Sequence, residues 1–159
     1  MAELFLLHPE VAGEWGDGTE VTNREELQSG ASKVPAISKL EYAFDGWLGD
    51  ELLESFPCFI VTDSLANDLA AAKLVGLEFG EVKVSKTDTF KELYPRKKLP
   101  VFKRLLPKGK VVLSGEKVKT WSGKDLSLTE SAELVVSAAA LAVLKKHQLE
   151  NCKIEELKT

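Results

Sequence analysis

The densest group of side chains that could do chemistry lies in the segment FDGWLGDELLE, where carboxylates surround a tryptophan. The acids are Asp45, Asp50, Glu51 and Glu54, and the ring is Trp47. Neighbouring carboxylates can divide acid and base roles in catalysis. An aromatic anchor ringed by acids also suits the docking of a basic protein, because aromatic side chains dominate binding hot spots. In a third interpretation the ring is core and the acids form a solvated helix face. We therefore treat these five residues as the candidate partner-binding site.

A second candidate is the basic stretch YPRKKLPVFKRLLPKGK. Its leading cations could neutralise phosphates, and its aromatic rings could stack on bases. These cations are Arg96, Lys97, Lys98, Lys103 and Arg104. Nucleic-acid modules are usually basic overall, whereas this chain has a net charge of −4. Charges on an edge strand also prevent sheet-to-sheet aggregation. A solvated edge or loop is therefore the first interpretation, and nucleic-acid binding is the alternative.

The remaining reactive residue types form no catalytic or metal motif. His8 and His147 are isolated in the sequence, and Cys58 and Cys152 lie in apolar segments where a thiol serves as a small hydrophobe. The short, repeated spacings of a zinc site are missing, and AGEWGDG lacks the pattern of a phosphate loop. We expect no catalytic residue, no metal and no cofactor.

Charge is distributed in blocks along the chain. Residues 1–82 hold 4 basic and 16 acidic residues (−12), and residues 83–124 hold 13 basic and 3 acidic residues (+10). Residues 125–159 hold 4 basic and 6 acidic residues, which gives −2. Blocks of like charge usually form one solvated face, and such fields steer charged partners. The blocks predict separate acidic and basic surfaces.

Length and composition are those of one ordinary globular domain. The 159 residues are 44% hydrophobic and 29% charged, and no apolar run reaches the roughly 20 residues that span a bilayer. The N-terminal MAELFLLHPE carries an acid in place of the basic start of a signal peptide. We expect a single domain over 1–159, located in the cytoplasm and away from membranes.

Hydrophobic periodicity predicts both strands and helices. Residues 3–7 and 40–44 read as strands, and the apolar spacing of WLGDELLESF favours an amphipathic helix. A short helix is expected near 24–28. Strands over 99–106 and 110–113 are expected to be joined by the turn PKGK.

The most informative pattern is an internal repeat. A shift of seventy-five positions places Val61 on Val136 and Thr62 on Ser137, and it also aligns the apolar positions that follow. Each copy reads as a strand, a hydroxyl helix cap, a helix, a stop at Gly76 or Asn151, and a second strand. The sequence therefore predicts an α+β fold, with a mixed sheet and helices built around similar strand–helix–strand units at 57–84 and 132–157. Whether the repeat reflects a true duplication stays open.

Several strings, in this order, resemble a family of small bacterial proteins that is grouped with the immunity proteins of polymorphic toxin systems. The most specific are DGWLGDEL, PCFIVTDSL and LVVS followed by a helix, and the resemblance extends from LFLLHPEVAGEWGDGTE to ELVVSAAALAVLKKHQLENCKIEEL. None of these strings is a catalytic signature. The resemblance implies a protein that binds and neutralises a cognate toxin.

The leading hypothesis is thus a non-enzymatic protein-binding domain whose partner is a cognate toxin. Its acidic first half would suit a basic nuclease toxin, because nucleases need positive clefts for phosphates. The basic stretch 96–110 would instead suit an acidic toxin, and the sequence does not choose between the two. The alternatives are a nucleic-acid-binding module that uses residues 96–110, and a small-ligand or enzyme domain of unknown activity. The oligomeric state is open.

Overall fold

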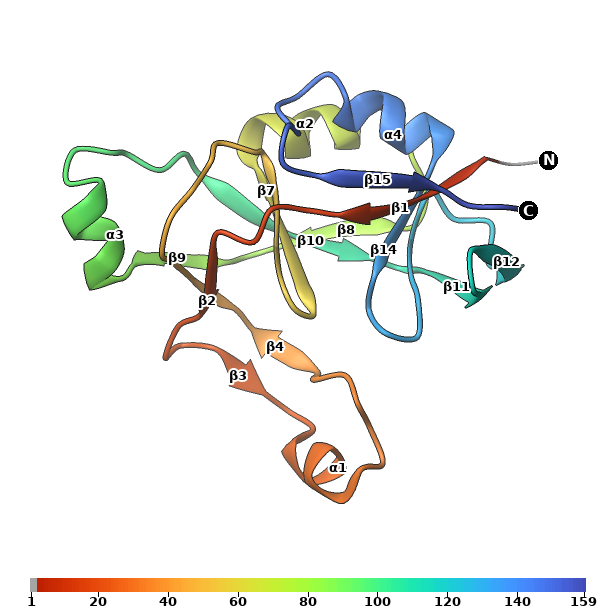
Figure 1. Ribbon diagram of the computed structural model, residues 1–159, viewed down its shortest axis with the longest axis horizontal. Helices are drawn as coiled ribbons and strands as arrows, with labels where there is room; N and C mark the ends of the chain where they lie inside the picture. The colour runs from red at the N-terminus through yellow and green to blue at the C-terminus, as the bar shows by residue number, and fades with distance from the viewer. Residues whose placement is uncertain (1–2) are drawn as a thin grey trace.

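The computed structural model describes residues 3–159, and within this range the chain forms fifteen strands and four short helices. The α+β prediction is confirmed (Figure 1). The strands are β1 (Leu4–His8), β2 (Gly13–Trp15), β3 (Glu20–Val21), β4 (Ile37–Lys39), β5 (Glu41–Phe44), β6 (Leu52–Ser55), β7 (Cys58–Thr62), β8 (Leu77–Gly80), β9 (Lys83–Lys86), β10 (Phe102–Pro107), β11 (Gly109–Ser114), β12 (Lys117–Trp121), β13 (Leu126–Leu128), β14 (Leu134–Ser137) and β15 (Lys153–Glu156). The helices are α1 (Arg24–Ser29), α2 (Asp63–Ala71), α3 (Asp88–Leu93) and α4 (Ala138–Leu144). Within residues 3–159 no helix is long and apolar enough to cross a bilayer.

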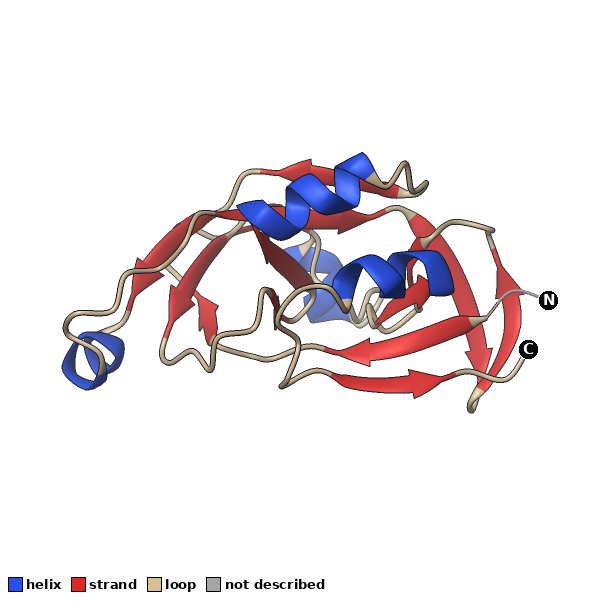
Figure 2. Cartoon of the chain, turned by 90° about the horizontal axis from the view of Figure 1, so that it is seen from above, coloured by secondary structure: helices blue, strands red, loops and turns tan. Residues whose placement is uncertain are grey.

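The strands form two larger sheets and two small ones. The six-stranded sheet has the order β12-β11-β13-β14-β1-β15, and the four-stranded sheet has the order β6-β7-β10-β8. β2-β5-β9 form a third sheet, and β3-β4 form a ribbon that extends from the body together with α1 (Figure 1). Helices α2 and α4 pack against each other, and Figure 1 shows them as neighbours above the strands. Figure 2 shows the molecule from that helical side.

The two larger sheets contain the same four-strand arrangement. In one unit β6, β7, β10 and β8 are neighbours in that order, and in the other β13, β14, β1 and β15 take the same places. Every neighbouring pair in both units is antiparallel. The registers also correspond, because Leu105 lies opposite Phe79 as Leu7 lies opposite Ile154. The first strand of the chain therefore completes the unit formed by its last strands.

Equivalent side chains from both units meet in one core. Leu65, Ala66 and Leu69 of α2 join Ala140, Leu141 and Leu144 of α4 in the same buried cluster. The central strands of both units contribute Leu105 and Leu7 to that cluster. Burial of these apolar side chains is the main favourable term that holds the two units together.

The correspondence extends further toward the N-terminus than the repeat expected from sequence. A shift of seventy-four aligns WLGDEL with WSGKDL. The indole Nε1 of Trp47 donates to the carbonyl of Asp50 (2.9 Å), and that of Trp121 donates to the carbonyl of Lys124 (3.0 Å). Each loop contains a glycine between the tryptophan and the acceptor residue, Gly49 with a φ of 110° and Gly123 with a φ of 85°. A positive φ favours glycine because it has no Cβ. The two loops thus bring the chain into β6 and β13 in the same way.

A carboxylate that follows each loop holds the N-terminus of the helix in its own unit. The cap hydroxyl of Thr62 accepts from the Leu65 amide (3.2 Å) and donates to Glu51 (2.7 Å). In the other unit Ser137 accepts from the Ala140 amide (3.2 Å) and donates to Asp125 (2.7 Å). The hydroxyls that the sequence predicts as helix caps are therefore oriented by Glu51 and Asp125, which directly precede β6 and β13.

The same two carboxylates also bind the turn that follows the helix of the opposite unit. Glu51 accepts from the Gln148 amide (3.0 Å), and its own amide donates to the Gln148 carbonyl (3.0 Å). Asp125 accepts from the Val75 amide (2.7 Å), and its own amide donates to the Val75 carbonyl (2.9 Å). We call this pair of reciprocal interactions the carboxylate clamps. Each clamp joins the two units through hydrogen bonds of one carboxylate and its own backbone.

The prediction of a helix over WLGDELLESF is wrong. Residues 52–55 form β6, whose successive side chains Leu52 and Leu53 point into different buried clusters and are each 0% exposed. A strand between two cores needs apolar residues on both faces, and over four residues this pattern cannot be told from a helical one. The turn PKGK likewise joins strands of different sheets, because β10 pairs with β7 and β8 while β11 pairs with β12 and β13.

Removing the charge of a clamp tests its role. We expect Glu51→Gln and Asp125→Asn each to lower the free energy of unfolding by about 2 kcal/mol, because charge-assisted hydrogen bonds are lost. Urea unfolding at pH 7 measures this change. Glu116→Gln is the control, since this side chain is 80% exposed on the β11–β12 hairpin. Clamp variants as stable as the control would show that the clamps contribute nothing.

The clamp should also show a defined pH dependence. Burial opposes ionisation of Glu51, but hydrogen bonds from Thr62 and the Gln148 amide, together with His147, outweigh it and lower the pKa of this carboxyl below 4.5. A lowered folded-state pKa gives stability that is present above the unfolded value and lost as the pH falls through the folded one. The difference between the wild type and Glu51→Gln should therefore be full at neutral pH and shrink below pH 4.5.

Candidate functional site

The five residues of the predicted acidic site separate into internal and surface groups. Asp45 is exposed, and Trp47 and Glu54 are half-buried. Asp50 is 0% exposed, and its carboxylate accepts from the backbone and side-chain amides of Asn151 (2.9 and 3.1 Å). The prediction that Asp50 lies on a docking face is therefore wrong, because its carboxylate lies inside the protein and holds the turn after α4. Asn151 donates in this contact. Its φ is not positive, so it does not end its helix in the left-handed conformation that Gly76 adopts.

Glu51 is occupied by internal partners. Besides its clamp contacts, it lies 3.1 Å from His147 Nδ1, and His147 Nε2 lies 2.7 Å from Asp68. The imidazole links the two helices and has an 8% exposed side chain. The nearby hydroxyl of Thr62 is buried and already donates to Glu51, so this chain of polar groups presents no nucleophile.

Neither thiol is activated. Burial raises the pKa of Cys58, against the opposing charge of Arg104. Burial and the negative charge of Asp50 raise the pKa of Cys152 to about 11. Thiols with raised pKa values are poor nucleophiles at neutral pH. In the described part of the chain no three His, Cys, Asp or Glu side chains lie together as a metal site would require.

The basic stretch does not form one cationic surface. Arg96 and Lys98 are exposed beyond α3, whereas Lys103 pairs with Asp63 (3.2 Å). Arg104 donates to the Ile37 carbonyl (2.9 Å), and its buried Nε has no partner. Successive residues of β10 point to opposite faces, so Lys103 and Arg104 cannot serve the same phosphate backbone.

The acidic and basic blocks of the sequence are interleaved in the fold. β10 lies between β7 and β8, and β9 pairs with β5. Three lysines of the basic block pair with acids of the first block: Lys83–Glu41 (3.5 Å), Lys103–Asp63 (3.2 Å) and Lys108–Glu78 (3.1 Å). The expectation that each block forms its own surface is therefore wrong at these strands, because pairing distant segments into sheets places opposite charges side by side.

Trp47 is where the two predicted sites meet. Its ring packs edge-on against Phe44 and Phe102, with centroids 6.4 and 6.0 Å apart. Lys97 Nζ lies 5.0 Å from the Trp47 centroid and donates to the Trp47 carbonyl (3.2 Å). This cation–π contact places a lysine of the basic stretch over the tryptophan of the acidic segment. Trp47 therefore anchors its loop to the core, and its neighbours form the exposed surface.

That surface contains an open groove with an acidic rim. The groove has a volume of about 590 Å³, and we call it the acidic groove. It is lined by Val11, Gly13, Glu14, Trp15, Glu54, Ser55 and Phe56. An adjoining depression of about 320 Å³ shares three of these residues and continues to the loop 45–48 and Tyr94. Val11 and Leu48 are each 67% exposed, Phe56 is 49% exposed and Trp15 is 37% exposed.

Short-range contacts hold the segments of this surface in place. Gly13 lets β2 approach β5, since a Cβ at this position would lie 2.0 Å from the Ala43 carbonyl oxygen. The carboxylate of Glu10 accepts from the amides of Leu48 (2.7 Å) and Asp50 (3.2 Å). The Ala12 carbonyl accepts from the amides of residues 45 and 46. The surface is therefore preorganised by backbone contacts, which lowers the cost of docking.

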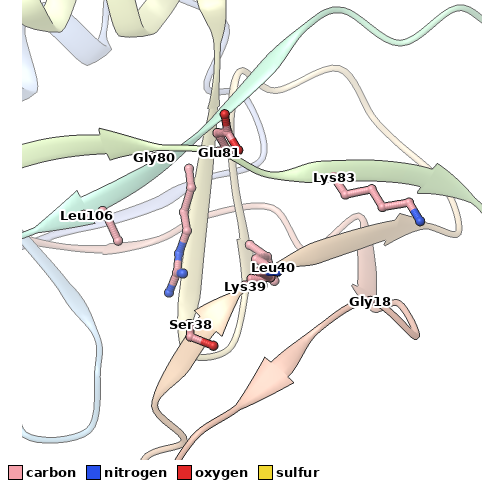
Figure 3. Close-up of a pocket in the computed structure, with 9 residues that line it drawn as sticks. Gly18, Ser38, Lys39, Leu40, Gly80, Glu81, Lys83 and Leu106 are labelled. Atoms are coloured by element: carbon pink, nitrogen blue, oxygen red, sulfur yellow. The ribbon is translucent and has the colours of Figure 1, made fainter.

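A different concavity tests the small-ligand alternative. It has a volume of about 490 Å³ and lies beside Arg104, between β4, β10 and the segment 80–83 (Figure 3). Its lysines are directed to acids, Lys39 to Glu20 (3.8 Å) and Lys83 to Glu41 (3.5 Å), and Figure 3 shows the Lys83 side chain extending away from Ser38. A ligand site needs polar groups that converge, and here they diverge.

Sequence reasoning found Trp47, Asp45 and Glu54 but missed the exposed apolar side chains of the surface. The available signal was the spacing of two between Val11, Gly13 and Trp15, which would place all three on one face of an extended segment. Phe56 had no local signal, because its exposure depends on the β6–β7 hairpin. Comparison of the chain with known family models and with curated proteins found no match.

Glu54 offers a test of the electrostatics of the groove. Burial raises the pKa of its carboxyl and the charge of Glu133 adds to this, against the opposing effect of His8. The folded state therefore holds this proton more tightly than the unfolded state does, so ionisation of Glu54 as the pH rises above 4.5 costs stability. We expect Glu54→Gln to raise Tm at pH 7 by on the order of 1–3 °C and to have no effect near pH 4. Calorimetry at both pH values measures this shift. Glu14→Gln is the exposed control, and an equal shift in that variant would refute the role of burial.

Proposed function

We propose that this chain is a non-enzymatic protein-binding domain and that the acidic groove with its adjoining depression is the docking surface. The observation that carries the proposal is the clustering of exposed apolar side chains. Seven large hydrophobic residues of the described chain are exposed, and four of them line this surface: Val11, Trp15, Leu48 and Phe56. Scattered exposed hydrophobics are ordinary, whereas a contiguous patch with a polar rim is typical of an interaction site.

The charge of the surface indicates the chemistry of the partner. The lining includes the carboxylates of Glu14, Asp45 and Glu54 and no lysine or arginine, and Lys97 lies beside it over the Trp47 ring. Acidic rims accelerate the association of basic partners and discriminate against acidic ones. The partner that fits is a protein with a cationic surface and an apolar protrusion.

The resemblance to immunity proteins supports a specific form of this function. A toxin that cleaves nucleic acid needs a positive cleft. A folded domain that places Trp15 and Phe56 against such a cleft, with carboxylates around them, would block it sterically and electrostatically. In this proposal neutralisation requires no chemistry, which agrees with the raised thiol pKa values and the internal roles of Asp50 and Glu51.

The test begins with co-expression of the chain and the products of neighbouring reading frames. A neighbour that is toxic alone, and that becomes harmless and co-purifies when this chain is present, would support the proposal. If no neighbour is toxic and none binds, the toxin-neutralising role fails.

The docking surface is tested by matched substitutions. We expect Phe56→Ala with Trp15→Ala to weaken the complex by about 2 kcal/mol or more, because truncated aromatic anchors lose hot-spot energy. Glu14→Lys with Asp45→Lys should slow association and reduce its salt dependence. Leu93→Ala and Val101→Ala are the controls, since they are exposed (62% and 69%) outside this surface. Titration calorimetry measures affinity, and circular dichroism checks folding. Equal losses in the controls would place the interface elsewhere.

A further inference from the structure

A second groove lies beside β11. It has a volume of about 460 Å³ and is lined by residues 107–112 and 128–130. We call it the basic groove. Its walls are apolar, with the half-buried Pro107, Val112 and Leu128, and its rim carries Lys108 and Lys110.

The basic groove occupies the position that matches the acidic groove when the two units are exchanged. The lining residues 128–130 follow 54–56 by the same shift of seventy-four that aligns the two tryptophan loops. On the other wall of the basic groove, parallel pairing places Gly109 opposite Ser127 and Lys110 opposite Leu128. Beside the acidic groove a parallel bridge pairs Glu10 with Leu53 in the same way. Each groove therefore lies where the two units meet, between the segment that follows β1 or β10 and the hairpin that joins the first two strands of the opposite unit. The same backbone forms a groove twice.

The two grooves differ in charge. The acidic groove carries Glu14 and Glu54, whereas the basic groove carries two lysines against the single exposed carboxylate of Glu130. Lys108 is paired with Glu78 (3.1 Å), and Lys110 is exposed with no ion pair in the described chain. Three further lysines, Lys117, Lys119 and Lys124, are exposed on β12 and the adjoining loop.

We infer that the basic groove is a second docking site and that it binds an acidic peptide segment of a protein partner. The lysines on the rim would pair with acidic residues of the peptide, and the apolar walls would contact apolar side chains that alternate with them. A polypeptide fits better than a nucleic acid, because the groove lining contains no aromatic ring on which a base could stack. This inference does not depend on the function proposed for the acidic groove, since it is carried by a separate set of residues.

The experiment is an NMR titration of the isotope-labelled full chain with synthetic probes. One probe is an octapeptide of alternating glutamate and valine, and the second replaces glutamate with lysine. An oligothymidylate of matching negative charge is the third probe. The buffer contains about 0.15 M salt to screen non-specific attraction. We expect the glutamate peptide to shift the amides of 108–112 and 128–130 saturably, and the lysine peptide to leave them unchanged.

Substitutions then assign the effect to the groove. Lys110→Glu should weaken binding of the glutamate peptide about tenfold, because it places a like charge on the rim. Lys119→Glu changes the net charge equally on β12, outside the lining, and should have little effect. Absence of saturable shifts, shifts confined to other residues, or stronger binding of the oligothymidylate at these amides would each overturn the inference. Equal losses in the two variants would also overturn it, since they would reveal only a general charge effect.

Discussion

The structure depends on one interaction made twice, in which a carboxylate joins the start of one helix to the turn after the other. Glu51 and Asp125 each accept from a cap hydroxyl of their own unit and from a backbone amide of the opposite unit. Backbone groups at helix ends and in turns must find partners when they are removed from water. Each carboxylate satisfies one such amide in the opposite unit and orients the hydroxyl that caps a helix in its own unit. The apolar faces of α2 and α4 supply the burial energy, and the clamps determine how the two units are positioned relative to each other.

This division of roles explains why function has to be sought at the periphery. Near the clamps almost every polar group already has a partner: Asp50 binds Asn151, and His147 bridges Glu51 and Asp68. Such groups stabilise the fold, and their hydrogen-bonding capacity is already used by internal partners. The segments that follow β1 and β10 carry different residues at equivalent positions. One backbone arrangement therefore presents an acidic groove with exposed aromatic rings and a basic groove with apolar walls. A function built on a scaffold of this kind resides in the side chains added to it.

Much of the fold could be predicted from local signals. The strand β7, the cap Thr62 and the helix α2 follow from an apolar run, a hydroxyl and helical spacing, and the same holds for β14, Ser137 and α4. The common origin of the two units remains a hypothesis. The candidate site was predictable only in part. Asp45, Asp50 and Glu51 are close in sequence and similar in chemistry, but their burial is set by residues about a hundred positions away, such as Gln148 and Asn151.

The sequence by itself determined the α+β class and the positions of the capped helices α2 and α4. These properties depend on periodicity, on side-chain chemistry and on neighbours within a few residues. Tertiary structure alone decided that residues 52–55 form a strand, that β1 completes a unit with β14 and β15, and which carboxylates face water. It also interleaved the charge blocks that the sequence keeps apart. The physical reason is that the strands pair with, and are buried by, segments distant in the chain. A local sequence pattern does not identify which distant segment will be the partner.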